Sequence, residues 1–108
     1  MSYQITDTKG VTRLNPDHKT MVAVLKELRK RSTNDDDAFP EAVLTHGSGW
    51  AIAATRKGTA ILEIPGEADS IYVLKRLEPD EVINLWQQLA MGNFERIRAL
   101  PWVRTDGP

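Results

Sequence analysis

A histidine and a serine two residues apart are the first candidates for chemistry in this chain. His46 and Ser48 stand in the sequence HGSGW, where a glycine flanks the serine on each side. A serine activated by a nearby histidine is a common hydrolase nucleophile. A nucleophile elbow, however, needs Gly-x-Ser-x-Gly between a strand and a helix. Here the Gly-Ser-Gly loop joins two expected strands and no orienting acid can be assigned, so we interpret it as a tight turn and expect no catalytic residues.

Three adjacent acids, Asp35, Asp36 and Asp37, are the second candidate. Carboxylates could together hold a hard cation such as calcium, but the pattern lacks the glycine and the distal glutamate of a calcium loop. The chain has no cysteine and only two histidines, which leaves few ligands for a softer metal. We therefore expect no metal and no other cofactor, and we interpret the three aspartates as a solvated connection.

A basic cluster on the first expected helix is the third candidate. Lys26, Arg29 and Lys30 fall roughly on its outward side, where they could contact phosphates. No aromatic residues are interleaved with them, and no known nucleic-acid-recognition motif is present in the sequence. A sequence pI near 6.1 gives no general attraction to nucleic acid. Nucleic-acid binding through this helix is therefore the alternative function. It predicts a steep salt dependence that falls when the three cations are replaced.

The three tryptophans are candidates for packing or for recognition. Trp86 falls on an apolar helical stripe, which favours a core position. Trp50 opens an expected central strand and is interpreted as a core anchor rather than part of a site. Trp102 follows Pro101, beyond the last expected helical turn. It either folds back over an open edge of the core or is exposed as an anchor for another protein, since interface hot spots favour tryptophan.

Two amphipathic helices are expected to position these residues. The first follows Asn15 as cap and Pro16 at the first helical position. The second has Pro79 at its first position, and Gly92 is placed to end it in the left-handed conformation. A short turn, FERIRAL, follows. The two apolar stripes are Met21, Val24, Leu25 and Leu28 in the first helix, and Val82, Leu85, Trp86 and Leu89 in the second.

The remaining segments predict antiparallel strands. YQIT and VTRL flank the tetrapeptide DTKG as a hairpin, and EAVLTH, GWAIAAT, TAILEI and SIYVLKRL form a four-stranded meander whose loops are too short for parallel crossovers. The expected fold is α+β, in the order ββαββββα plus a short C-terminal helix. Both main helices pack on one face of the sheet, and the other face is wet or covered by a partner. Residues 103–108 are expected to fray.

Length and composition bound the protein class. A chain of 108 residues with 41% apolar residues predicts a single domain over 1–108. No run of apolar residues approaches the length of a membrane span, and the N-terminus lacks the basic, apolar and small-residue segments of a signal peptide. We therefore expect a cytoplasmic protein without a membrane partner. The formal charge is +4 over residues 1–33, −6 over residues 34–81 and +1 over residues 82–108.

The order helix, meander, helix, closing in LWQQLAMGNFERIRALPW, resembles the Imm1-type immunity proteins that accompany bacterial polymorphic toxins. Those families pair a strand meander with a late amphipathic helix, then a glycine and a proline-containing segment that ends in tryptophan. The resemblance covers roughly residues 41–102. It implies a non-enzymatic role in binding a partner, with acidic loops or an exposed sheet face as the contact surface. No binding residue can be matched one by one, so none is transferred.

The preferred hypothesis is a small bacterial-type domain that binds another protein and performs no chemistry. It would act by occlusion, in the manner of an immunity protein or antitoxin, on a basic partner such as a nuclease or deaminase toxin. The residues expected to take part are five acids of the middle third and one tryptophan: Asp35, Asp36, Asp37, Glu67, Asp69 and Trp102. An uncovered sheet face or an open edge strand would also favour a homodimer.

Overall fold

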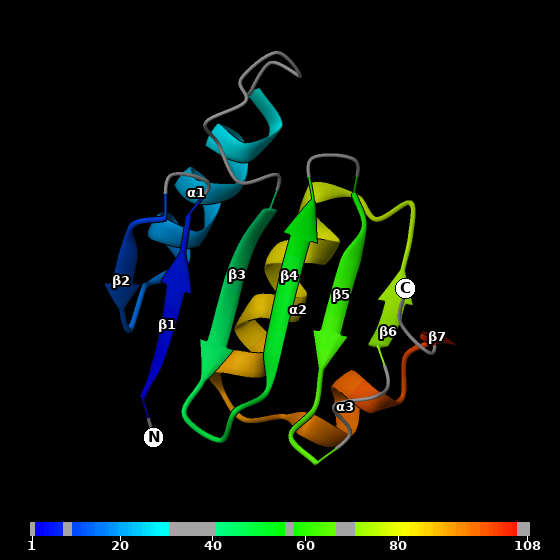
Figure 1. The fold of residues 1–108 in the computed structure, drawn as a ribbon. Helices are drawn as coiled ribbons and strands as arrows, with labels where there is room; N and C mark the ends of the chain where they lie inside the picture. The colour runs from blue at the N-terminus through cyan, green and yellow to red at the C-terminus, as the bar shows by residue number, and fades with distance from the viewer. Residues whose placement is uncertain (1, 8–9, 31–40, 56–57, 67–70, 106–108) are drawn as a thin grey trace.

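A computed structural model describes residues 2–7, 10–30, 41–55, 58–66 and 71–105 (Figure 1). Within these ranges the chain forms one seven-stranded antiparallel sheet and three helices, which confirms the α+β class. The elements in chain order are β1 (Tyr3–Thr6), β2 (Thr12–Leu14), α1 (His18–Lys30), β3 (Glu41–His46), β4 (Ala51–Thr55), β5 (Ala60–Glu63), β6 (Ile71–Leu74), α2 (Pro79–Ala90), α3 (Phe94–Arg98) and β7 (Val103–Thr105).

The expected hairpin and meander join into one sheet of order β2-β1-β3-β4-β5-β6-β7. Strands β3 to β6 each pair with the next strand in sequence, as their short loops require. Strand β7 follows α2 and α3 and returns to pair with β6. The hairpin joins through β1, which pairs with β3 and places Ile5 opposite Leu44. The same row continues through Ile52 and Leu62, so one face of the sheet presents a continuous line of large apolar side chains.

Helices α1 and α2 lie together on that apolar face, behind the sheet in the view of Figure 1. The apolar stripes expected for both helices are buried. They pack against the apolar residues that alternate along the strands and point to the same side of the sheet. Trp86 of α2 is completely buried, and its indole N–H donates a hydrogen bond of 3.0 Å to the carbonyl of Ile52 in β4. The core position expected for Trp86 is therefore confirmed.

The first helix begins later than the sequence suggested. Asn15 has a positive φ of 46° and its side-chain oxygen accepts a 3.2 Å hydrogen bond from the Tyr3 backbone N–H, so it serves the β1–β2 unit rather than the helix. The cap is Asp17, whose carboxylate accepts a 2.8 Å hydrogen bond from the backbone N–H of Thr20. The expected N-cap role of Asn15 is thus wrong by two positions.

The C-terminal region differs from the expectation at one point. Pro79 begins α2 and Gly92 takes a φ of 76°, both as expected. Val103–Thr105, expected to fray, instead form β7 and pair with β6. The sheet edge at β6 offers unpaired backbone groups there, and Trp102 packs against the core directly before the strand. Residues 106–108 lie outside the described ranges.

None of the described helices combines the length and the apolar character needed to cross a membrane.

Candidate functional site

The side chains of His46 and Ser48 are in contact at the turn between β3 and β4. The Nδ1 atom of His46 lies 2.9 Å from the Ser48 hydroxyl and accepts a 3.1 Å hydrogen bond from the Ser48 backbone N–H. The same hydroxyl oxygen accepts a longer bond, 3.4 Å, from the backbone N–H of Trp50. These bonds all lie within the turn, so the pair closes the loop HGSGW locally.

An aromatic cluster holds this turn against α3. The His46 ring meets Phe94 edge-on with a centroid distance of 5.2 Å, and the Trp50 ring lies 4.6 Å from the same phenyl ring. His46 is only 6% exposed, while Trp50 is half-buried and packs on the core. Trp50 thus lies where an anchor was expected. The three rings fix the end of the sheet to the first residue of α3.

The chemistry open to this cluster is limited by its geometry. A pocket of about 220 Å³ beside β1 is lined by His46 but not by Ser48, so the two side chains do not converge on one cavity. Among the described residues no carboxylate is hydrogen-bonded to His46, whereas a nucleophilic serine needs an oriented histidine. The arrangement supports a turn-closing role for the pair.

The face of the sheet opposite the helices is the second feature that could have a function. Strand residues that alternate with the core positions point to it, and in Figure 1 it faces the viewer with no described helix over it. One cross-strand row runs over all seven strands and is largely apolar. Its members are Thr12, Thr6, Val43, Ala53, Ile61, Val73 and Val103.

Among the described strand residues, the charged side chains that point to this face are all negative. Glu41 and Glu63 alternate with the buried Ala42 and Leu62, so both carboxylates point to the uncovered side. The two strand arginines fall in the other register. Arg13 stands opposite Ile5 and Arg104 opposite Tyr72, both in the row that faces the helices. The uncovered face is therefore apolar along its centre row and anionic beside it.

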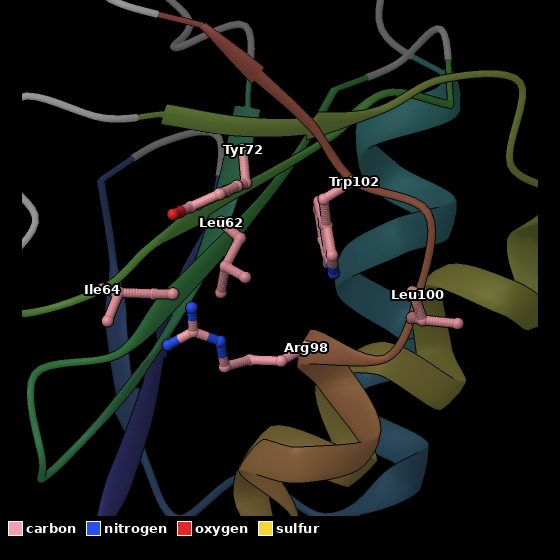
Figure 2. Close-up of a pocket in the computed structure, with 6 residues that line it drawn as sticks. All are labelled: Leu62, Ile64, Tyr72, Arg98, Leu100 and Trp102. Carbon is pink, nitrogen blue, oxygen red and sulfur yellow. The ribbon is translucent and has the colours of Figure 1, made fainter.

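A second concave feature lies at the edge of the helix-covered side, between α3 and the last strands. It is a pocket of about 120 Å³ lined by Leu62, Ile64, Tyr72, Arg98, Leu100 and Trp102, and Figure 2 shows these side chains. Trp102 is half-buried, and its indole N–H donates a 2.6 Å hydrogen bond to the carbonyl of Ile97. Of the two alternatives for Trp102, the structure has the one in which it folds back over the core edge.

Most of the other predicted site residues lie outside the part of the chain that the structure describes. Asp35, Asp36, Asp37, Glu67 and Asp69 all lie outside the described residues. Lys26 is exposed on α1, and Arg29 and Lys30 belong to the same helix, but the positions of their side chains are not described. Within the described ranges, no group of three or more histidines, cysteines or acids is placed to hold a metal ion.

Sequence reasoning anticipated an uncovered sheet face, but it missed the apolar row on that face and the pocket beside α3. The alternation of Val43, Ile61 and Val73 with core residues could have indicated the apolar row, but the row exists only in the observed strand register. The pocket depends on Trp102 folding back ahead of β7, and that strand was not expected.

No family model, curated protein or solved structure matches this chain. The likeness to Imm1-type proteins therefore stays a prediction from the sequence.

Proposed function

We propose that this chain is a non-enzymatic protein-binding domain that docks a basic partner on its uncovered sheet face. The observation that carries the proposal is the cross-strand row of apolar residues on that face, which no described helix covers. Antiparallel sheets with one solvated face normally alternate apolar and polar residues, so valines and isoleucines at the outward positions indicate a surface that is covered in use.

The negative charge of the uncovered face indicates the class of partner. Glu41 and Glu63 point to the uncovered side, and no described strand lysine or arginine accompanies them there. The sequence from residue 34 to 81, which supplies β3 to β6, carries a formal charge of −6. An anionic surface around an apolar centre attracts a cationic protein and disfavours an anionic one, because complementary charge raises the association rate and like charge is penalised.

Occlusion is the mechanism that fits a face without a catalytic group. A stable complex covers about 800 Å² on each partner, which is enough to block a substrate-binding surface. Nucleases and nucleic-acid deaminases carry basic surfaces because they bind phosphate backbones. A toxin of that kind has the charge and the surface that this face would cover, in line with the immunity role implied by the sequence resemblance.

The test is affinity capture from a nuclease-treated lysate of the source organism. The immobilised protein is compared with Ile61→Arg, which places a cation at the centre of the row on β5. The matched control is Ala23→Arg, the same new charge at an exposed position of α1. We expect a basic protein to be retained by the wild type and by Ala23→Arg, and lost with Ile61→Arg.

Three results would overturn the proposal. One is retention that is identical for the wild type and Ile61→Arg, since the face would then play no part. Another is a captured protein whose contact surface is acidic. The third is capture that occurs from a parallel untreated lysate and is absent from the nuclease-treated one, which would favour nucleic-acid binding by Lys26, Arg29 and Lys30 instead.

A further inference from the structure

We propose that a groove beside the start of α2 binds a peptide segment in which an apolar residue lies between an acidic and a basic residue. The groove has a volume of about 430 Å³ and is lined by the end of β6, the first part of α2 and the residues that lead toward β7. Its strand residue Leu74 stands opposite the buried Ala60, so the groove is on the helix-covered side of the sheet. The proposal is therefore independent of the partner assigned to the uncovered face.

The accessible lining of this groove is mainly apolar. Leu85 of α2 is only 3% exposed and forms the base, and Leu74 and Leu77 are half-buried beside it. Leu100, which precedes Pro101 on the remaining side, is 39% exposed. An apolar side chain in the groove would cover leucine surface that water now contacts, and removing that surface from water favours binding.

The size and the openness of the groove favour a segment of a longer chain as its occupant. Clefts for small molecules enclose about 300 to 1,000 Å³ and bury most of the ligand surface. This groove has a volume in that range, but it is broadly open to solvent. A free small molecule would stay largely exposed in it, whereas a chain segment can leave its backbone and its neighbouring residues in water.

Charged residues of both signs line the groove and indicate the charges of the occupant. Lys75 and Arg76 come from the turn after β6, and Asp80 comes from the first turn of α2. Within the described part of the chain, none of these three side chains has an ion pair or a hydrogen bond. A ligand with only one sign of charge would be repelled at one of the two segments. An acidic residue at the turn and a basic residue at the helix would be attracted at both.

The turn that carries the two cations is held by a neighbouring turn. The backbone N–H of Leu77 donates a 2.9 Å hydrogen bond to the carbonyl of Gly58 in the β4–β5 turn, which lies beside this part of the chain in Figure 1. Gly58 has a φ of 83°, and a Cβ there would lie 2.6 Å from the Leu77 carbonyl oxygen. Arg76, directly before Leu77, takes a φ of 62°, which is uncommon for a residue with a side chain. A turn fixed in this way loses little conformational entropy on binding.

The experiment titrates four tripeptides with acetylated N-termini and amidated C-termini into the ¹⁵N-labelled protein. Their sequences are Glu-Phe-Lys, Gln-Phe-Lys, Glu-Phe-Gln and Glu-Gly-Lys. We expect Glu-Phe-Lys at millimolar concentration to shift the backbone amide resonance of Leu77 and the side-chain amide resonances of Asn84, which also lines the groove. The other three peptides should bind more weakly. The indole resonance of Trp86, which is completely buried, should stay unchanged.

Variants assign each charge of the peptide to one side of the groove. Asp80→Asn should weaken binding of Glu-Phe-Lys about threefold, the effect of one exposed ion pair, and leave Glu-Phe-Gln unaffected. The double variant Lys75→Gln, Arg76→Gln should weaken Glu-Phe-Lys and leave Gln-Phe-Lys unaffected. The matched control is Glu95→Gln, which removes an exposed carboxylate of α3 outside the groove and should change none of the affinities.

Three outcomes would overturn the proposal. Equal affinity for all four peptides would show that neither the charges nor the apolar residue is recognised. Resonances of Leu77 and Asn84 that stay unchanged with every peptide would show that the groove is not the binding site. A loss with Glu95→Gln as large as the loss with Asp80→Asn would show attraction to the overall charge of the protein rather than to the groove.

Discussion

At the scale of single residues, the three tryptophans have different roles because they differ in burial and in hydrogen bonding. Trp86 is fully buried with its N–H bonded to the Ile52 carbonyl, Trp50 is half-buried against Phe94, and Trp102 covers the core edge. Trp86 was predictable because its helical spacing decides its environment. The environment of Trp102 was not, because it depends on a strand that forms after it.

The contrast gives a stability prediction for Trp86 and Trp50. We expect Trp86→Ala to lower the free energy of unfolding by about 3 to 5 kcal/mol, because it leaves a cavity in the core and removes the hydrogen bond to the Ile52 carbonyl. Trp50→Ala should lower it by about 2 kcal/mol, since part of that ring already contacts water. Chemical denaturation measures both. Equal losses would contradict the difference in burial.

At the scale of elements, the start of α1 gives a pH prediction. The backbone N–H of Thr20 bonds to the ionised Asp17 carboxylate, and this lowers the pKa of Asp17 from its ordinary value of 3.8. The folded state therefore favours the charged form. The stabilisation is complete above the ordinary pKa and is lost as the pH falls through the lowered one.

Asp17→Ala should accordingly unfold at a lower temperature than the wild type near neutral pH, and the two midpoints should converge as the pH falls below 3.8. Asp17→Asn is the control, since it keeps an oxygen acceptor for the cap and removes the charge. Thermal unfolding followed by circular dichroism across this range measures the effect. A gap that stays constant with pH would exclude the carboxylate as the cause.

The elements themselves were largely predictable from the sequence. The segment EAVLTH forms β3 with the expected bounds, because its alternation leaves one choice of face. The start of α1 was misplaced because Asn15, a good cap by type, is used by Tyr3. Strand β7 was missed because it has only three residues, which are too few to show the alternation of apolar and polar side chains that marks a strand. Its pairing comes from the free edge of β6.

At the scale of the whole molecule, the two-layer architecture makes neighbouring residues of one strand respond differently. Ile61 lies on the uncovered face, and Leu62 points into the core with 1% exposure. Ile61→Arg should change the free energy of unfolding by about 1 kcal/mol or less. Leu62→Arg should lower it by more than about 4 kcal/mol, because it buries an unpaired charge. Urea titrations of both variants make the comparison, and a similar loss for each would refute the assignment of faces.

The candidate surfaces were less predictable than the fold. The apolar row requires Val43, Ala53 and Ile61 to stand side by side, and that register is set by the lengths of the turns as well as by the strands. The pocket requires contacts between residues as far apart as Leu62 and Trp102. Periodicity along the chain indicates which side chains are buried, but not which distant residues meet.

The position of β1 between β2 and β3 also has a consequence for the order of folding. From β3 to β6 each strand pairs with the next, so this part of the sheet closes only short loops. The β1–β3 contact joins Ile5 to Leu44 across the whole of α1. Closing that longer loop costs more chain entropy, and we therefore expect it to be the slower step. The meander can therefore assemble first and serve as the template onto which the N-terminal hairpin is added.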